Sequence, residues 1–314
     1  MKRPIVTGAV ITVFAALAFT ACKKEDKNGG NGSNPTGPYS SVSQVYTELR
    51  TPSKTVTIDA ATGGSFRGLK GTRFIFPANA FRTAAGAGVT GSVQVEVREM
   101  LDHSDMIFSK LLPVSNNNPL ISGGEVWVNA TQNGQKLYLK NNTYFRANIP
   151  YDGNNGNGML LFLGEASNDT NVTVVNWMPQ DSMGAGGIIV GNDTLSVFSD
   201  STGYCNADQF LTNPDYQSFT VNVTGVSGLA ANNVMGYAVY DGYNSMWTLG
   251  GYTGSNFAAS HIPDIPVHFV VFAVVNGNFY GGIAAATPSN GSTYTVNLSQ
   301  MTPASFATQV DALP

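Results

Sequence analysis

Charged side chains are scarce in this sequence. Only 11% of its 314 residues are Asp, Glu, Lys or Arg, about half the share in an average soluble chain, and acids outnumber bases by 20 to 16. Nucleic-acid-binding proteins need a basic surface, and coiled coils need charged residues beside their apolar seam. The composition argues against both classes, and we expect no nucleic-acid partner.

The motifs of several enzyme classes are also missing. No G-x-S-x-G elbow of a serine hydrolase occurs, and neither a phosphate-binding loop nor the glycine fingerprint of a dinucleotide fold is present. The carboxylate pair of a glycoside hydrolase forms in space rather than at a fixed spacing, so this class stays open. It would be favoured if two of six acids converged in a cleft: Glu96, Glu99, Asp102, Asp105, Glu125 and Glu165.

Histidine occurs three times, at His103, His261 and His268. Asp102, His103 and Asp105 lie close together in sequence and could ligate a metal, but no second cluster stands at ligand spacing. We therefore predict a solvated loop here, with no metal site and no cofactor. The stretch 152–158 is similar to a calcium loop, but Gly156 stands at its third liganding position and Leu163 stands where a bidentate glutamate is required, so we expect a long hairpin turn.

Turn-forming and aromatic residues are plentiful. Gly occurs 35 times and Pro 15 times, and Phe, Tyr and Trp make up 11% of the chain. Apolar and polar residues alternate over Val93–Val97, Phe145–Ile149 and Phe219–Val223, which is the period of half-buried strands. Asn133–Gly134 and Asn276–Gly277 favour the backbone angles of tight hairpins. We predict an all-β protein with two β-sandwich domains in tandem.

Two segments depart from this alternation. Val267–Val275 is apolar at nearly every position, which predicts a central strand covered on both faces. Helical periodicity is almost absent elsewhere, and the one helix that we expect is at the end of the chain. Thr302 can cap it and Pro303 can begin it, with the helix running to Ala312.

The first residues predict export. Lys2 and Arg3 precede the uncharged, mainly apolar stretch Ile5–Ala21, which is the layout of a secretory signal peptide. Phe19–Cys22 resembles the lipobox of bacterial lipoproteins, in which the cysteine is lipidated and becomes the new N-terminus. The resemblance implies a durable membrane anchor through acyl chains on Cys22, at the outer membrane or cell surface of a Gram-negative bacterium.

The second cysteine has no partner once Cys22 carries lipid. A disulfide framework is therefore excluded despite the export signal. No histidine lies near Cys205 in sequence, so we expect Cys205 to be a small buried side chain rather than a nucleophile.

Composition and pattern divide the chain into six parts. The expected parts are a signal peptide at 1–21, a flexible tether at 22–44, a first β-sandwich domain at 45–175, a bridging segment at 176–214, a second β-sandwich domain at 215–300 and a C-terminal helix at 301–314. The tether is rich in Gly, Asn, Ser and Pro, a composition that buries little apolar area.

Four short motifs in the first predicted domain combine turn residues with strand patterns: Gly63–Gly64, Thr72–Phe81, Val89–Val93 and Ser122–Glu125. With them, the chain from 58 to 139 resembles a ZU5-like β-sandwich that recurs in bacterial surface lipoproteins. Thr202–Phe210 looks like a motif that follows this domain in similar chains. The resemblance implies a fold rather than an activity.

Some ZU5 relatives cut themselves at a His-Phe-Ser triplet. The nearest string here is Ile107–Ser109, which lacks the histidine that would accept the serine proton. We therefore expect the chain to stay intact.

Six aromatic residues crowd a glycine-rich stretch of the second predicted domain: Tyr237, Tyr240, Tyr243, Trp247, Tyr252 and Phe257. Tyrosine and tryptophan offer flat apolar faces with a polar edge, which suits stacking on sugar rings or peptides. Tyr243, Trp247 and Tyr252 flank predicted turns, so we expect them to be exposed and name them as candidate ligand-binding residues. The alternative is that members of this set fill the domain core.

Together these features predict a lipid-anchored cell-envelope protein, associated with the membrane through its N-terminal lipid. We expect a non-catalytic binding or spacer module with a glycan or peptide ligand, and we assign no catalytic residue. Two alternatives stay open. One is a subunit of a surface protein assembly, which long exposed apolar strand edges would favour, and the other is a glycoside hydrolase-type enzyme.

Overall fold

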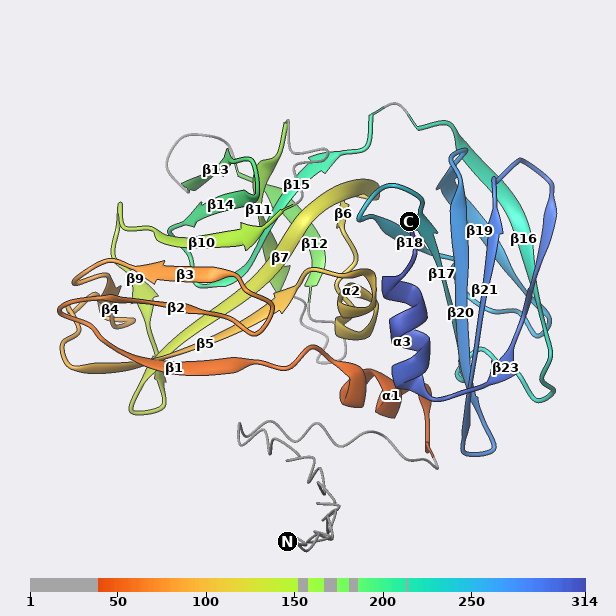
Figure 1. The fold of residues 1–314 in the computed structure, drawn as a ribbon, viewed down its shortest axis with the longest axis horizontal. Helices are drawn as coiled ribbons and strands as arrows, with labels where there is room; N and C mark the ends of the chain where they lie inside the picture. Colours follow the sequence, from red (N-terminus) through yellow and green to blue (C-terminus); the bar gives the residue numbers. More distant parts are fainter. Residues whose placement is uncertain (1–38, 152–157, 167–173, 181–185, 213) are drawn as a thin grey trace, which may run out of the picture. The chain divides into compact units, whose positions relative to one another are not determined.

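The computed structural model describes residues 39–151, 158–166, 174–180, 186–212 and 214–314 of the chain. Within these residues strands far outnumber helices, and the strands form two lobes (Figure 1). The first lobe ends at Phe210 and the second begins at Tyr216, and each has its own apolar core between its sheets. The predicted all-β fold with two β-sandwiches is confirmed.

The first lobe is a sandwich of two large sheets with a small third one. Its strands are β1 (Lys54–Asp59), β2 (Gly64–Arg67), β3 (Arg73–Phe76), β4 (Phe81–Arg82), β5 (Ser92–Met100), β6 (Val114–Ser115), β7 (Asn118–Gln132), β8 (Gln135–Lys136), β9 (Tyr138–Leu139), β10 (Phe145–Pro150), β11 (Leu160–Ala166), β12 (Val174–Pro179), β13 (Gly186–Val190), β14 (Thr194–Ser199) and β15 (Gly203–Phe210). One sheet has the order β1-β5-β7-β15-β11-β12, with β6 and β8 paired to β7. The other has the order β13-β14-β10-β3-β2, and β4 pairs with β9. Alternate residues such as Val95 and Ala147 point inward from the two large sheets and form one core.

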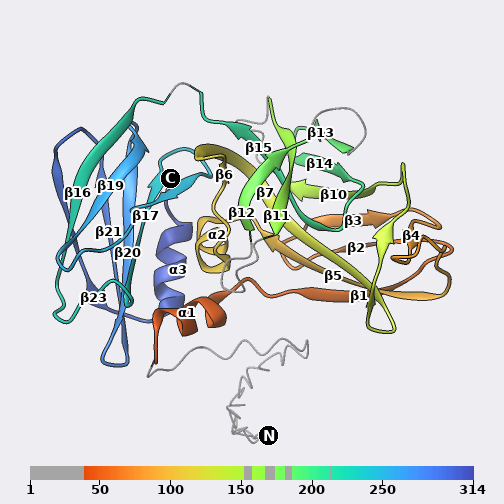
Figure 2. The same ribbon diagram turned by 180° about the vertical axis from the view of Figure 1, so that it is seen from behind.

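The second lobe is a smaller sandwich (Figure 2). Its strands are β16 (Tyr216–Thr224), β17 (Val234–Tyr240), β18 (Met246–Thr248), β19 (Asn256–Pro263), β20 (Val267–Val275), β21 (Asn278–Ala286), β22 (Thr293–Asn297) and β23 (Ser299–Gln300). One sheet has the order β19-β16-β22 and the other β18-β17-β20-β21-β23. The two predicted hairpins are confirmed, because Asn133 and Asn276 have positive φ angles where β7 turns into β8 and β20 turns into β21.

Strand β20 is covered on both faces, as its nearly uninterrupted apolar sequence predicts. On one face, Phe269, Val271 and Ala273 pack in the core of the second lobe. On the other face, Phe272 and Val274 belong to a different apolar cluster. A strand of this kind needs a layer on each side, and helices supply the second layer.

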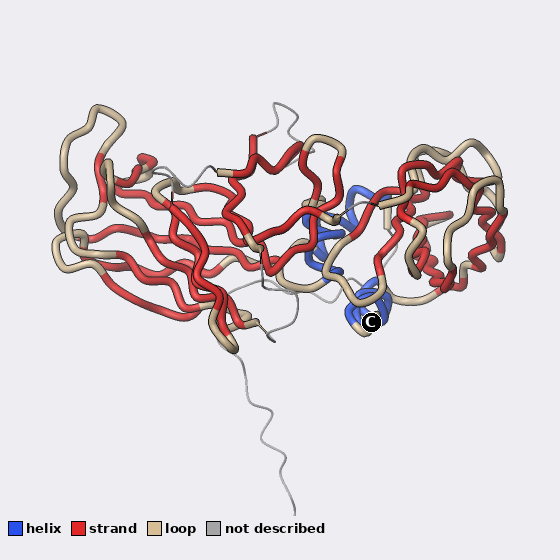
Figure 3. The backbone as a smooth tube through the Cα atoms, turned by 90° about the horizontal axis from the view of Figure 1, so that it is seen from above, coloured by secondary structure: helices blue, strands red, loops and turns tan. Residues whose placement is uncertain are grey.

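The described residues contain three helices: α1 (Val42–Leu49), α2 (His103–Ser109) and α3 (Pro303–Asp311). Figure 3 shows them grouped between the strands of the two lobes, and all three bury apolar residues in the cluster that covers β20. The rings of Tyr46, Phe108 and Phe306, one from each helix, lie 5.6 to 5.7 Å from the ring of Phe272. Trp177 from the first lobe packs in the same cluster, so the helices join the lobes.

Of these helices the sequence predicts only α3, whose cap is confirmed: the hydroxyl of Thr302 accepts a hydrogen bond from the backbone N–H of Ser305 at 3.2 Å. The solvated loop predicted over Asp102–Asp105 is wrong. α2 begins there, and His103, Ser104 and Asp105 are buried. The Asp105 carboxylate accepts from the backbone N–H of Asp102 and closes the first turn. A helix of seven residues is too short for a 3.6-residue period to stand out.

Strand pairing carries the first lobe past the domain boundary expected at residue 175. The segment expected to bridge the domains, 176–214, contains β13, β14, β15 and most of β12, and all four pair with strands of the first lobe. These four strands therefore belong to the first lobe rather than to a bridge. Of the expected tether, 22–38 lies outside the described residues, as do the expected signal peptide and Cys22. Tyr39, by contrast, is buried beside Phe279.

Candidate functional site

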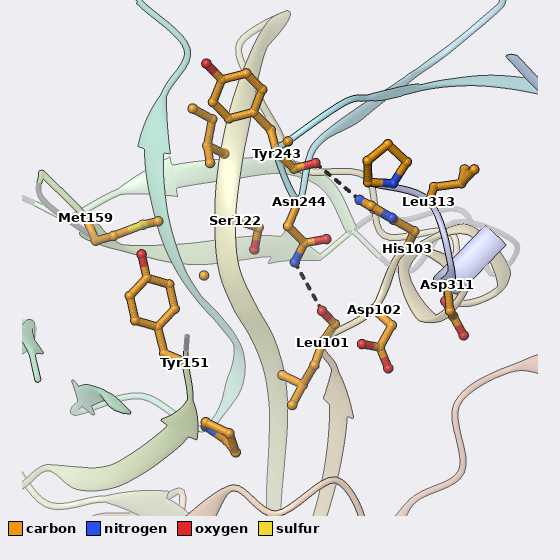
Figure 4. Close-up of a pocket in the computed structure, with 15 residues that line it drawn as sticks. Leu101, Asp102, His103, Ser122, Tyr151, Met159, Tyr243, Asn244, Asp311 and Leu313 are labelled. Atoms are coloured by element: carbon orange, nitrogen blue, oxygen red, sulfur yellow. Dashed lines mark hydrogen bonds between the residues drawn. The ribbon is translucent and has the colours of Figure 1, made fainter. Parts of the chain in front are cut away.

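A cavity of about 430 Å³ lies between the two lobes (Figure 4). The first lobe lines it with the β5–α2 turn, residues near the start of β7, the end of β10 and the residue before β11. The second lobe lines it with the β17–β18 turn and the residues around the end of α3. The polar residues of its wall include Asp102, His103, Ser122, Tyr151, Tyr243, Asn244 and Asp311. Its volume falls within the range of about 300–1,000 Å³ that is usual for small-molecule sites.

Hydrogen bonds hold the β17–β18 turn of the second lobe against the first lobe. The imidazole Nε2 of His103 lies 3.2 Å from the carbonyl oxygen of Tyr243. The Asn244 side-chain amide donates to the carbonyl of Leu101 at 3.1 Å, and the Asn244 carbonyl accepts from the backbone N–H of Ser122 at 2.9 Å. Two of these bonds are drawn in Figure 4. They fix the distance between the two walls of the cavity.

A further pair of bonds joins α2 to α3 at the same cavity. The backbone N–H and the hydroxyl of Ser104 donate to the two carboxylate oxygens of Asp311, each at 2.8 Å. Ser104 lies in the first turn of α2, where unpaired N–H groups favour a negative partner. The Asp311 carboxylate is thereby held in one orientation beside the cavity.

The cavity wall carries acids but no lysine or arginine. Asp102 is paired with Lys70, which also pairs with Asp105 behind it. Burial lowers the pKa of His103, so the imidazole stays neutral to lower pH than an exposed histidine. Burial raises the pKa of Asp311, while the bonds from Ser104 oppose that rise. The wall is therefore rich in hydrogen-bond acceptors whose charges are already partnered.

Behind the cavity, a chain of hydrogen bonds leads from Ser122 into the first lobe. The Ser122 hydroxyl accepts from the backbone N–H of Gly124 at 3.1 Å and donates to the side-chain oxygen of Asn206 at 2.9 Å. The amide nitrogen of Asn206 in turn donates to Glu125 at 3.2 Å and to Asp208 at 2.7 Å. Two carboxyl groups thus share one amide at the inner end of the chain.

Strand pairing explains how these residues meet. β7 and β15 are neighbours, with Asn206 opposite Glu125 and Asp208 opposite Ser122, and the register shifts between Asn206 and Asp208. The strands pack closely at Gly123, where a Cβ atom would lie 2.2 Å from the end of the Leu195 side chain and 3.1 Å from the carbonyl oxygen of Ala207. The two sequence motifs Ser122–Glu125 and Thr202–Phe210 therefore combine into one buried polar network.

Burial dominates the electrostatics of this network. Glu125 and Asp208 are both fully buried, and burial raises the pKa of each carboxyl well above its ordinary value. The charge of Asp208 raises the pKa of Glu125 further, while the bond from Asn206 opposes the rise at Asp208. One oxygen of each carboxyl has no hydrogen-bond partner among the described residues. The pair therefore keeps its protons to higher pH than exposed acids do.

Of the three predicted ligand-binding residues, the structure brings only Tyr243 to the cavity. Trp247 is half-buried, with its ring centroid 5.3 Å from that of His261. The expected exposure of Tyr252 is wrong, because its side chain is 6% exposed and packs against Phe257 in the second-lobe core. A tight turn brings Tyr252 opposite Phe257 in an isolated bridge and carries its ring inward, which is the alternative that the sequence left open.

The six acids proposed for a hydrolase do not converge in the cavity, which only Asp102 of that set lines. Asp105 and Glu125 are buried away from it, and Glu99 accepts from the backbone N–H groups of Lys70 and Thr72. The second carboxylate of the cavity is Asp311, which the sequence did not point to. Its role depends on the docking of α3 against α2, a contact that no local motif reveals.

Cys205 is fully buried, as predicted, and burial raises the pKa of its thiol to about 12. Ile107, Phe108 and Ser109 lie buried within α2. No group of three or more His, Cys, Asp or Glu side chains in the described part of the chain is arranged to hold a metal ion. The stretch compared with a calcium loop lies, up to residue 157, outside the described residues.

No family model matches the chain, and no curated protein matches it in sequence. The resemblance to a ZU5-like domain and to the lipobox therefore stays a prediction. Among the described residues, no helix has the length and apolar character needed to cross a bilayer.

Proposed function

We propose that this protein is a lipid-anchored, non-catalytic binding protein of the bacterial cell envelope, and that its ligand is a neutral sugar held between the two lobes. The observation that carries the proposal is the cavity of about 430 Å³ that both lobes line. Its size suits a small ligand, and Tyr243, a predicted ligand-binding residue, contributes to its wall.

The chemistry of the wall favours a neutral ligand with many hydroxyl groups. No lysine or arginine lines the wall, so an anionic ligand would find no cationic side chain to form an ion pair with. The charge of Asp102 is partnered by Lys70 and that of Asp311 by the donors of Ser104, so a cation gains little. Carboxylate oxygens in this state still accept hydrogen bonds from sugar hydroxyls. The rings of Tyr151 and Tyr243 offer faces on which a sugar ring stacks.

The ligand is tested by screening the full-length chain against an array of neutral, acidic and basic oligosaccharides. We expect hits among the neutral ones, and we expect Tyr243→Leu to weaken the strongest hit by about tenfold, because a stacking face is lost. Trp247→Leu is the matched control, since it removes an aromatic ring from the same lobe outside the cavity. Tyr243→Leu leaves intact the backbone carbonyl that meets His103.

Three results would contradict the sugar-binding proposal. They are the absence of any hit, hits confined to charged glycans, and an equal loss of binding in Trp247→Leu and Tyr243→Leu. A bound glycan that is shortened during incubation would instead contradict the non-catalytic part and favour a hydrolase that uses Asp102 and Asp311.

The membrane anchor has its own support in the lipobox-like residues Phe19–Cys22 after an apolar stretch. Metabolic labelling with an alkyne-bearing fatty acid tests it. We expect label on the wild-type chain and on Cys205→Ser, and none on Cys22→Ser. Equal labelling of all three chains would show that Cys22 is not the site.

A second candidate function, a subunit of a surface assembly, is favoured by the edge strand β13. In the described part of the chain β13 ends its sheet, and Ile189 and Val190 on it are 61% and 42% exposed. Apolar residues on an unpaired edge favour pairing with another strand. If this edge joins two copies of the chain, light scattering should show a dimer that Ile189→Lys converts to a monomer. A monomeric wild-type chain would exclude that mode.

A further inference from the structure

One sheet of the second lobe has an outer face without charge. It is the sheet β19-β16-β22, whose inner face packs in the second-lobe core, and Figure 1 shows β16 and β19 at the outer side of this lobe. None of the residues in its three strands is Asp, Glu, Lys or Arg. The outward positions carry hydroxyl and amide groups and one methyl group, and they include Thr220, Asn222, Thr224, Asn256, Ala258, Ser260, Thr293, Thr295 and Asn297.

Strand pairing arranges these outward groups in rows. β16 and β22 run parallel, and their outward residues lie directly opposite each other: Thr220 and Thr293, Asn222 and Thr295, Thr224 and Asn297. On β19, Ala258 and Asn256 extend the first two rows. Neighbouring strands lie about 4.8 Å apart, and residues on one face repeat about every 6.6 Å along a strand. The outward groups therefore form a regular polar grid.

The first two rows of the polar grid are open. In the described part of the chain, no hydrogen bond engages the side chains of their four members on β16 and β22: Thr220, Asn222, Thr293 and Thr295. The third row is bonded within itself, because the Thr224 hydroxyl donates to the side-chain oxygen of Asn297 at 3.2 Å. At the opposite end of the sheet, His261 stacks on Tyr216, and its Nε2 atom lies 2.8 Å from the carbonyl oxygen of Asn117 in the first lobe. The open rows lie between these two contacts.

The chemistry of the polar grid favours one class of partner. Nucleic acids and anionic lipid surfaces require clustered basic residues, whereas the only charged residues adjoining these strands are Asp215 and Asp264, at the Tyr216 end. Trp, Tyr and Arg dominate protein–protein affinity, and Ser and Thr contribute to it less frequently. Hydroxyl and amide groups both donate and accept hydrogen bonds, as sugar hydroxyls do. An uncharged grid of such groups matches an uncharged sugar chain.

From this match we propose that the polar grid binds a neutral polysaccharide, whose chain lies across the open rows of the sheet. Each hydrogen bond replaces one to water and adds little affinity, so a single short sugar gains too little here to stay bound. A polymer presents many units to the same surface, and linked weak contacts raise the overall affinity. The grid shares no residue with the inter-lobe cavity, so this site does not depend on the ligand proposed there.

Native electrophoresis of the full-length chain tests the polar grid, in gels that contain xyloglucan, mixed-linkage β-glucan, galactomannan or dextran. We expect at least one of these neutral polymers to slow the chain relative to a gel without polymer. The double variant Thr293→Val, Thr295→Val should weaken that binding about tenfold, because valine keeps the shape of threonine and lacks its hydroxyl. The matched control is Thr55→Val, Thr57→Val, which removes two exposed hydroxyls at the same spacing from β1 in the first lobe. It should bind as the parent does.

Ala258→Arg gives an independent check, because it places a bulky charged side chain opposite Thr220 and removes no hydroxyl. We expect it to abolish polymer binding while far-ultraviolet circular dichroism shows a folded chain. Tyr243→Leu should leave polymer binding unchanged, which separates the polar grid from the inter-lobe cavity.

Four results would overturn the polysaccharide proposal. They are the absence of retardation in all four gels, unchanged binding in both grid variants, an equal loss in the β1 control, and a loss in Tyr243→Leu, which would assign the polymer to the cavity. A dimer that Ala258→Arg converts to a monomer in light scattering would likewise overturn it, in favour of a second copy of the chain.

Discussion

β20 in the second lobe and β7 in the first lobe are central strands that each turn one face toward the helices. The side chains on these two faces differ in polarity. β20 in the second lobe presents Phe272 and Val274, which pack in an apolar cluster. β7 in the first lobe presents Glu125, whose pKa is raised by burial and then by the charges of Asp208 and of Asp105 on α2. An apolar face needs only matching shape, whereas buried carboxyls need partners and lower stability when these are incomplete. The comparison indicates that β20 stabilises the fold and that β7 gives up stability beside the cavity.

The largest change in the free energy of unfolding is expected for a substitution on β20. Phe272→Ala removes a ring that rings from all three helices surround, and we expect a loss of about 3–5 kcal/mol in the free energy of unfolding. Urea denaturation measures it. Tyr280→Ala, on the half-buried face of neighbouring β21, should cost less than half as much. Equal losses would mean that β20 is not the main support of the helical layer.

On β7, by contrast, we expect a substitution to raise the free energy of unfolding rather than lower it. Burial raises the pKa of folded Glu125 above its unfolded value of about 4, so the folded chain binds protons more tightly above that pH. Stability is therefore complete below the unfolded pKa and falls as pH rises toward the folded one. Glutamine is neutral at every pH, so Glu125→Gln should gain about 1–3 kcal/mol at pH 8. Its stability should also fall less steeply than that of the parent as pH rises, and the buried Asp208 accounts for the fall that is left.

Denaturation curves at several pH values measure this gain. Glu96→Gln is the control, since Glu96 lies on the adjacent strand β5 and is only half-buried. It should not reproduce the gain at pH 8. If Glu125→Gln is less stable than the parent at pH 8, the Glu125 carboxylate stabilises the fold. The proposed difference between β7 and β20 would then be wrong.

A smaller change in the free energy of unfolding is expected for a substitution at the contact between α2 and α3. Ser104→Ala removes the hydroxyl that donates to Asp311, and we expect a loss of about 1–2 kcal/mol in stability. Sugar affinity should fall as well, because the Asp311 carboxylate is then held by one bond instead of two. Ser305→Ala, at an exposed position of α3, should change neither quantity. Unchanged affinity in Ser104→Ala would remove Asp311 from the binding account.

Features that depend on local pattern could be predicted from the sequence. Strict alternation located strands such as β5, an unbroken apolar run located β20, and Thr302 with Pro303 located α3. Helices α1 and α2 were missed because each spans only about two turns and is formed by docking on β20. Short helices owe most of their stability to such tertiary contacts.

The candidate site was predictable only in part. Tyr243 could be named because aromatic residues beside turns are frequently exposed, but the same rule failed for Tyr252, which a tight turn carries into the core. Glu125 and Asp208 are 83 positions apart and meet only through the pairing of β7 with β15. Asp311 joins the cavity through helix docking alone. Sites that are assembled by strand pairing and helix docking produce no recognisable motif in the sequence.

The most direct test of the central claim is a crystal structure of the protein with the neutral oligosaccharide that it binds most tightly. The account predicts a sugar ring in the inter-lobe cavity, stacked on Tyr243 and hydrogen-bonded to Asp102 or Asp311. Sugar density at any other surface, or an unoccupied cavity at a saturating concentration of a glycan that binds in solution, would contradict it.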